Sequence, residues 1–502
     1  MCCSPYSITK DNEMTVLIVG AGPTGLTLAC DLARRGVPHR IVDRAAEPFI
    51  GSRAKGLQAR TMEVFDDLGI VDRILDGGEP FPKFRLYQGH TVVWERTVDE
   101  LLGAPARSAS PSIPYPGPWL IPQWRTERIL RDRLAELGGG VEWNTEISGL
   151  TQDSDGVTLH TGDGSLRADY VVAADGGRST LRKALGVGFE GDTFDIERTL
   201  IGDVRADGLD GRRCHLLTGG GDVGERFSLW NLPDSDYYQF VATVPAERTP
   251  ELTLDAVRQL CRDRSGRTDI HLHDLRWISL YKVNVRMVDR FRVGRVFLAG
   301  DAAHVHSSAG GQGLNTGVQD AYNLGWKLAA VIDGADPALL ETYAAERMPV
   351  AAQVLGLSTL LHHQDFHGGD SAPSIDQLDI TYRNGPLALD DREAPGPLRA
   401  GDRAPDGVLS SGKRLFDLFR GPHATVLAVG AAVEDFGVPT VAAEGYDVAS
   451  GTYVLVRPDG YIGAISESAA AIRKYLAATV LPSEPRPASF DAANIGGRRP
   501  GW

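Results

Sequence analysis

The segment Val16-Leu17-Ile18-Val19-Gly20-Ala21-Gly22-Pro23-Thr24-Gly25 decides the fold of this chain. Its first four residues form a continuous apolar run, which predicts a strand buried on both faces. A helical pattern follows and is ended by Gly36, and residues 40–43 predict the next strand. A glycine-rich turn between a buried strand and a helix is typical of a dinucleotide-binding unit.

The glycines of this turn have separate physical roles. Gly20 allows the tight turn, Gly22 lets a pyrophosphate approach the backbone, and Gly25 lets helix and strand pack closely. The N-terminus of the helix then offers N–H groups and positive potential to the phosphates. Asp43 ends the second strand, 18 residues after Gly25, where a carboxylate accepts hydrogen bonds from a ribose. These features together favour a nucleotide site over a chance glycine turn.

Two later motifs suggest further contacts with the same ligand. Asp175-Gly176-Gly177-Arg178-Ser179 follows a buried strand predicted up to residue 175, although a simple turn with a solvated arginine explains it equally well. Gly300-Asp301-Ala302-Ala303-His304 follows a third buried strand, and a glycine-rich loop over 310–317 then leads into a helix. Such a loop is a second anion site. A nucleotide with phosphates at one end and an anionic ring at the other would use both sites, and reduced FAD has such a ring.

Composition narrows the class of protein. The 502 residues are 42% hydrophobic and 24% charged, as in a soluble protein of about three domains. The net charge of -14 argues against nucleic-acid binding. Five scattered cysteines without Cys-x-x-Cys argue against a disulfide framework and a zinc site. No signal peptide is evident, and no apolar run reaches the ~20 residues that span a bilayer. We therefore expect a cytoplasmic protein without a metal or a membrane partner, either a monomer or a homodimer.

The pattern of apolar runs predicts an α/β protein with an interrupted order of domains. The expected parts are a flexible N-terminal extension over 1–13, the first part of the nucleotide-binding domain over 14–190 with some substrate-domain segments near 84–120, a β-sheet substrate domain over 191–285, the second part of the nucleotide-binding domain with a long helix over 286–365, a linker over 366–400, and a C-terminal domain over 401–502.

The three glycine motifs resemble those of the single-component FAD-dependent aromatic hydroxylases of the para-hydroxybenzoate hydroxylase type. Gly294 to His304, with the stretches 312–317 and 319–321, is the most specific part, and residues 51–54 and 122–127 fit as well. The resemblance covers about residues 14–360 and is closest to the aromatic polyketide hydroxylases. It implies a Rossmann-like FAD domain, an interleaved β-sheet substrate domain and a thioredoxin-like C-terminal domain. That last domain would be structural and not redox-active, because the last cysteine is Cys261.

The resemblance also implies an activity. FAD would be bound tightly but non-covalently, NADPH would reduce it transiently, and dioxygen would form a flavin hydroperoxide that hydroxylates an aromatic, polyketide-like phenolic small molecule. A Baeyer–Villiger or decarboxylating outcome on the same scaffold stays open, as does a flavin-bound protein that sequesters a reactive intermediate with little turnover. The motifs do not separate NADPH from NADH.

The candidate site residues follow from these motifs. By resemblance, Asp43 holds the adenosine ribose, Asp301 binds the ribityl chain, and the backbone around residues 313–315 faces the flavin pyrimidine ring. No catalytic residue can be named. The cofactor-binding candidates are Gly20, Gly22, Pro23, Thr24, Gly25, Asp43, Arg44, Arg53, Gln123, Asp175, Arg178, Gly300, Asp301, Gly311, Gly313, Leu314 and Asn315.

The substrate pocket is less well defined. Phe227, Trp230, Tyr238 and Phe240 are its aromatic candidates, although packing in a core would explain most of them. Ser308 is a further candidate, because the family usually has a proline near this position, against the flavin. We expect Ser308 to change the lifetime of the peroxide or the mobility of the flavin.

Overall fold

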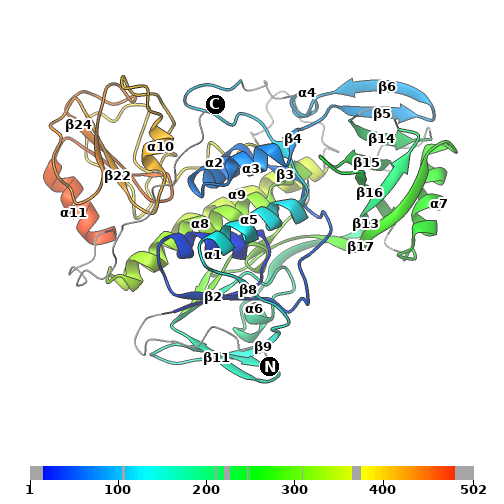
Figure 1. Cartoon of the computed structure of the whole chain (residues 1–502), viewed down its shortest axis with the longest axis horizontal. Helices are drawn as coiled ribbons and strands as arrows, with labels where there is room; N and C mark the ends of the chain where they lie inside the picture. Colours follow the sequence, from blue (N-terminus) through cyan, green and yellow to red (C-terminus); the bar gives the residue numbers. More distant parts are fainter. Residues whose placement is uncertain are drawn as a thin grey trace.

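The computed structural model describes residues 15–103, 108–209, 212–219, 226–245, 247, 249–307, 309–363 and 375–480. Ser308 and the predicted extension over 1–13 therefore lie outside the described residues. Figure 1 shows a helix-covered sheet in the middle, a large mixed sheet on one side of it and a small C-terminal unit on the other.

The central sheet carries the nucleotide fold. Its strand order is β18-β19-β12-β1-β2-β8, and β1 runs parallel to both of its neighbours. All four residues of β1 are buried, as predicted for a strand covered on both faces. The strands are β1 (Val16–Val19), β2 (His39–Val42), β8 (Val141–Glu142), β12 (Tyr170–Ala173), β18 (Arg292–Val293) and β19 (Val296–Leu298).

Helices pack side by side over this sheet (Figure 1). Helix α1 (Pro23–Arg34) begins directly after the glycine turn and lies against α5 (Gln123–Glu136) and α8 (Gly313–Ile332). Pro23 suits the first turn because its missing N–H would have no helical partner there. The other helices of this region are α2 (Ala59–Asp67), α3 (Val71–Asp76), α4 (Val98–Leu102), α6 (Thr180–Ala184) and α9 (Glu341–His363).

A large mixed sheet forms the second region, in the order β20-β17-β13-β16-β15-β14-β5-β6. Strands β5 and β6, which precede α5 in the chain, join this sheet beside β14, so the two regions are interleaved. Helix α7 (Leu254–Ser265) covers one face. The strands are β5 (Phe84–Gln88), β6 (Thr91–Arg96), β13 (Glu190–Asp207), β14 (Cys214–Thr218), β15 (Phe227–Asn231), β16 (Tyr237–Pro245), β17 (His271–Met287) and β20 (His304–Val305).

Small elements complete these two regions. Two three-stranded sheets have the orders β11-β10-β9 and β3-β7-β4, and three short 3-10 helices lie close to α8 in the chain. The strands are β3 (Gly56–Leu57), β4 (Glu79–Pro80), β7 (Trp119–Leu120), β9 (Ile147–Gln152), β10 (Val157–Thr161) and β11 (Gly164–Ala168), and the 3-10 helices span Gly300–Ala302, Ala309–Gly311 and Pro337–Leu340.

The C-terminal unit is a five-stranded sheet in the order β21-β25-β24-β22-β23 with two helices. It begins earlier than the predicted boundary at residue 401, because β21 pairs with β25 and the Tyr382 ring lies 4.3 Å from that of Tyr461. The described part of the predicted linker is therefore packed. The elements are β21 (Leu389–Asp390), α10 (Leu415–Phe419), β22 (Thr425–Val429), β23 (Thr440–Ala443), β24 (Thr452–Val456), β25 (Ile462–Ser466) and α11 (Ala469–Thr479).

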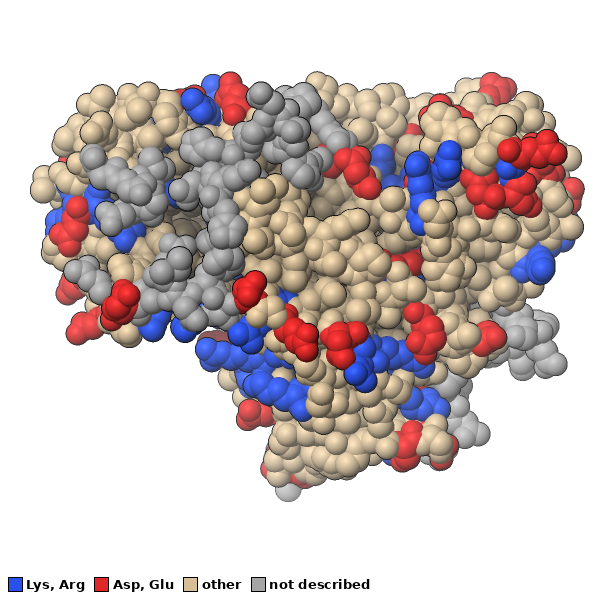
Figure 2. Space-filling model, turned by 180° about the vertical axis from the view of Figure 1, so that it is seen from behind, with Lys and Arg blue, Asp and Glu red and all other residues tan. Residues whose placement is uncertain are grey.

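The surface seen in Figure 2 mixes acidic and basic side chains, with wide areas that carry neither. None of the helices in the described part of the chain combines the length and the apolar character needed to cross a bilayer. Among the same residues, no three His, Cys, Asp or Glu side chains gather as metal ligands.

Candidate cofactor and substrate site

The glycine turn after β1 is shaped by close backbone contacts. Gly20 has a φ of +109°, and a Cβ there would lie 2.2 Å from the carbonyl oxygen of Ala174. A Cβ at Gly25 would lie 1.9 Å from the carbonyl oxygen of Gly20. A Cβ at Gly22 would instead meet no atom within 4 Å. Two glycines are thus required by packing, whereas Gly22 leaves its backbone open to a ligand.

The same turn presents unsatisfied donors. Gly22 is the N-cap of α1, and no side chain of the described residues caps this helix end, so its first N–H groups and its positive potential face outward. Asp43 lies beside it, half-buried, and one of its carboxylate oxygens accepts a 2.7 Å hydrogen bond from the amide of Ala21. The second oxygen accepts from the amide of Ala45 at 2.8 Å. These bonds hold the carboxylate where a ribose would lie.

A second glycine contact joins the third motif to the first. Gly300 has a φ of +58°, and a Cβ there would lie 2.6 Å from Oγ1 of Thr24, at the start of α1. A Cβ at Gly317 in α8 would lie 2.4 Å from the same oxygen. Asp301 follows Gly300 and is exposed. The first turns of α1 and α8 and the Gly-Asp motif therefore meet at one place.

The loop before α8 is held by one buried amide. Asn315 is fully buried, and its side chain accepts from the amide of Gln58 at 2.8 Å and donates to the carbonyl oxygens of Gly56 and Gly311. Gly311 has a φ of +63°, a conformation that favours glycine. Among the residues that the structure describes, no side chain caps the N-terminus of α8. The side chain of Asn315 thus fixes the loop, and the start of α8 can face an anionic ring.

The segment 51–54 lies next to the same crevice. Arg53 is exposed and close enough to Asp301 to lower the pKa of that carboxyl group, although the surrounding protein raises it more. Gln123, at the start of α5, accepts from the amide of Ala54 at 3.0 Å and donates to Glu127 at 2.8 Å. Burial raises the pKa of Glu127 to about 7. Sequence reasoning did not single out Glu127, because only its burial and its closeness to Asp43 distinguish it from other helical glutamates.

The second motif has a structural role. One carboxylate oxygen of Asp175 accepts from the amides of Thr180 and Leu181 and so caps the start of α6. Arg178 is exposed, as is Arg44 after β2. Within the described part of the chain neither arginine contacts the glycine turn, and their contact with the cofactor stays a prediction.

The four aromatic candidates lie on different faces of the large sheet. Phe227 and Phe240 are fully buried with their rings stacked 5.8 Å apart, and they belong to the core that α7 covers, with Tyr238 packed against it. Trp230 points to the other face, where its ring contacts Phe84. Packing in this core accounts for Phe227, Phe240 and Tyr238, whereas Trp230 faces the side of the sheet away from α7 and stays a pocket candidate.

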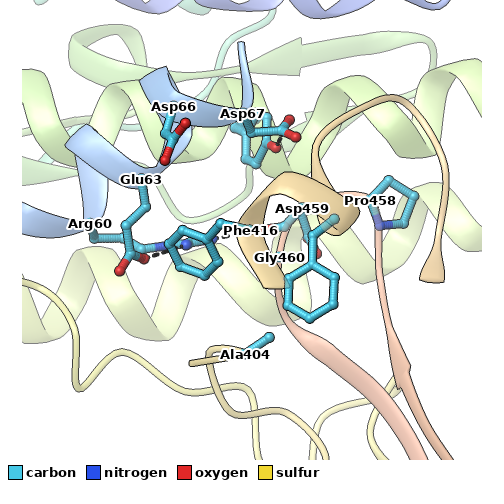
Figure 3. Close-up of a pocket in the computed structure, with 11 residues that line it drawn as sticks. Arg60, Glu63, Asp66, Asp67, Ala404, Phe416, Pro458, Asp459 and Gly460 are labelled. Carbon is cyan, nitrogen blue, oxygen red and sulfur yellow. Dashed lines mark hydrogen bonds and ion pairs between the residues drawn. The ribbon is translucent and has the colours of Figure 1, made fainter. Parts of the chain in front are cut away.

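A small hollow lies elsewhere, between α2, α8 and the C-terminal unit. In Figure 3 the side chain of Arg60 points toward Glu63, to which it donates at 2.7 Å. It also donates to the carbonyl oxygen of Asp459, and Asp67 accepts from Tyr322 and from the amide of Gly421. Because these polar groups already have partners and lie away from the glycine turn, this hollow is an interdomain seam and not the cofactor site.

The crevice between the glycine turn, the Gly-Asp motif and α8 suits a long nucleotide. Two uncapped helix ends, the open backbone at Gly22 and the carboxyl groups of Asp43 and Asp301 supply partners for phosphates and for sugar hydroxyls. These features define a dinucleotide-binding fold. Residues 13–358 match the family described as "FAD binding domain", and the chain belongs to this family.

Similar proteins agree with this assignment. A flavin-dependent monooxygenase of Mycobacteroides abscessus is 62% identical over 93% of this chain and 100% of its own length. A 12-dehydrotetracycline 5-monooxygenase/anhydrotetracycline 6-monooxygenase of Streptomyces rimosus is 36% identical over 89% of this chain and 94% of its own. Aklavinone-11 hydroxylase, solved with FAD and aklavinone, is 27% identical with a TM-score of 0.78 and covers 94% of this chain and 100% of its own.

These findings confirm three predictions. The fold class is α/β, of the kind found in FAD-dependent aromatic hydroxylases. FAD is the resident cofactor. The chain is an enzyme, an FAD-dependent monooxygenase. The likeness of the C-terminal unit to thioredoxin stays a prediction.

Proposed function

We propose that this monooxygenase hydroxylates an aromatic, polyketide-like phenolic small molecule, with NADPH as the transient reductant and dioxygen as the oxygen source. The observation that carries this proposal is the junction of the FAD crevice with one face of the large sheet. The segment 51–58 runs between them: Arg53 lies near Asp301, Gln58 is bound by Asn315, and Lys55 contacts the sheet. Relatives named for tetracycline and aklavinone chemistry support the substrate class.

FAD would be held tightly but non-covalently by the glycine turn and the Gly-Asp motif, and after reduction it would supply the activated oxygen, as a flavin hydroperoxide, to the substrate. The protein's own part is to bind, orient and exclude water. The uncapped start of α8 would hold the flavin ring by its positive potential, which would favour a negatively charged reduced cofactor. The three described cysteines are free and buried, which fits the cytoplasmic location that we include in this proposal.

The test uses purified, FAD-loaded protein with anhydrotetracycline, NADPH and isotopically labelled dioxygen. We expect NADPH oxidation that is stimulated by the phenol, and a product one labelled oxygen heavier that resists base. A product that base opens would indicate ester insertion, and loss of carbon dioxide would indicate decarboxylation. Flavin that is bound but not turned over with any phenol tested would contradict the proposal and support sequestration. NADH in parallel assays determines which nicotinamide is used.

A further inference from the structure

A polar pair interrupts the aromatic face of the large sheet. The strand register places Asp203 directly opposite Gln239 on one side and Trp277 on the other. Gln239 is in turn opposite Trp230 on β15. Residues opposite one another on neighbouring strands share a face of a sheet. These four side chains therefore form a row across the face opposite α7, and the row lies under the segment 49–55.

Contacts with that segment fix the position of the row. The Trp277 ring packs edge-to-face on Phe49 at 5.2 Å. Gln239 donates to the carbonyl oxygen of Ser52 and accepts from the ammonium group of Lys55. The same ammonium group lies 4.1 Å from the centre of the Trp230 ring. Lys55 thus stands on the aromatic face, half-buried, in the segment that leads on to the loop before α8.

The row also holds a buried carboxylate. Asp203 is completely buried, and the hydroxyl and the amide of Ser52, which is fully buried as well, face its carboxylate group. Burying a carboxylate costs stability, and carboxyl groups with strongly shifted pKa values gather at functional sites.

The polar and charged groups that face Asp203 come from the segment above it and from β17. Burial raises the pKa of Asp203 to about 7, and this rise is opposed by hydrogen bonds from Ser52 and by the positive charges of Arg276 on β17 and Lys55. Burial lowers the pKa of Lys55 to about 8, opposed by Cys214 on β14 and by Asp203. Lys55 therefore loses its proton more easily than an ordinary lysine, and Asp203 is positioned to tune that loss.

We propose that Lys55 is the catalytic base and oxyanion holder of the substrate site, and that Asp203 is a positioning residue that sets the charge of Lys55. This inference rests on the proposed function. The neutral amine of Lys55 takes the proton of a phenol or enol hydroxyl of the substrate. The O–H bond breaks, an N–H bond forms, and the ammonium group then pairs with the oxyanion, so no electrons are transferred. An ionised ring is richer in electrons and accepts an electrophilic oxygen more readily.

Ionisation of a bound phenol tests this without turnover. The probes are anhydrotetracycline and 4-nitrophenol, whose absorbance changes on ionisation, bound to oxidised FAD-loaded protein across a pH series. We expect the ionisation midpoint to fall by at least one pH unit on binding to the native protein. In the Lys55→Met variant the ionisation midpoint of the bound phenol should equal that of the free phenol or lie above it. Lys83→Met is the matched control, because Lys83 is exposed beside the same sheet, and it should behave like the native protein.

Steady-state kinetics separate the two residues. Lys55→Met should lower kcat about 100-fold, the usual size of a general-base effect. Lys55→Arg keeps the positive charge but cannot take a proton, so it should bind the phenol normally and lose kcat. In Asp203→Asn the rising limb of the kcat/KM pH profile should move to lower pH, because Lys55 loses a negative neighbour. Asp207→Asn, at an exposed position of the same strand, should leave the profile unchanged.

The possible outcomes distinguish the role of Lys55 as a base from the proposed hydroxylation of a phenol. An unchanged ionisation midpoint in the native protein, or failure of both phenols to bind, overturns the role of Lys55. Hydroxylation by Lys55→Met at the native rate overturns it too and leaves the proposed function standing. A shifted midpoint without any hydroxylated product supports the role of Lys55 and contradicts the proposed function.

Discussion

Arg457 of the C-terminal unit forms a two-nitrogen ion pair with Glu346 of α9, at 2.6 and 3.0 Å, and both side chains are completely buried. Lys327 of α8 donates to the same glutamate at 2.8 Å. Burial alone would raise the pKa of Glu346, but these two cations hold that pKa far below its usual value. The C-terminal unit is therefore anchored to the two long helices by a buried charge cluster.

Breaking this pair should weaken the whole protein. Arg457→Met leaves Glu346 and Asp459 buried without their main cation, which costs about 3–5 kcal/mol in comparable cases. We expect a clearly lower midpoint of thermal unfolding. Arg473→Met is the matched control in the same unit, because its pair with Glu434 is exposed and is worth at most about 1 kcal/mol. Equal effects of the two substitutions would show that the buried pair does not anchor the unit.

The glycine turn allows folding and cofactor binding to be separated. Gly25→Ala should destabilise even the apoprotein by roughly 1–3 kcal/mol, since its methyl group would overlap the carbonyl oxygen of Gly20. Gly22→Ala should leave the thermal midpoint of the apoprotein unchanged, because a methyl group there meets no protein atom. It should nevertheless weaken FAD binding at least about tenfold by occupying the space left for the pyrophosphate. FAD titration of both apoproteins checks this, and normal FAD affinity in Gly22→Ala would move the pyrophosphate elsewhere.

Asp301 offers a direct test of the ribityl contact. In Asp301→Ala a sugar hydroxyl would lose a charge-assisted partner, so FAD should bind about 1.5–3 kcal/mol more weakly. Asp289→Ala is the control, because Asp289 is exposed and pairs only with its neighbour Arg290 among the contacts seen. Fluorescence titration of the two apoproteins gives both affinities. Unchanged affinity in a correctly folded Asp301→Ala protein removes Asp301 from the cofactor site.

Local patterns in the sequence predicted the nucleotide fold well. The run 16–19 is β1, and the helix predicted after the loop over 310–317 is α8, because apolar periodicity depends only on neighbouring residues. The faces of the large sheet were not predictable in this way. Alternation shows that Phe227 and Trp230 point to opposite sides, but only the position of α7 decides which side is core.

Contacts between strands and between domains could not be predicted from the sequence either. Asp203 and Gln239 become neighbours only through the register of β13 with β16. Arginine is usually found at the protein surface, so the sequence predicts an exposed Arg457. Only the structure shows that Arg457 is buried between the C-terminal unit and α9. Such pairs are set by tertiary packing, which overrides local preference, and the sequence therefore pointed to the cofactor crevice but not to Lys55.

Glu127 provides a prediction on pH. Its side chain is buried, and burial raises the pKa of its carboxyl group from 4.5 to about 7 in the folded chain. The folded state thus holds this proton more tightly than the unfolded state. The stability linked to this proton is fully present below about pH 4.5 and is lost as the pH rises through about 7, by up to about 3 kcal/mol.

Glu127→Gln removes the titration, so the variant apoprotein should match the native apoprotein near pH 5 and unfold at a higher temperature at pH 8. Glu136→Gln, at an exposed site on the same helix, should show no such gain at pH 8. Thermal unfolding at a series of pH values measures both, and a Glu127→Gln protein whose advantage does not grow with pH would show that Glu127 is already ionised at neutral pH.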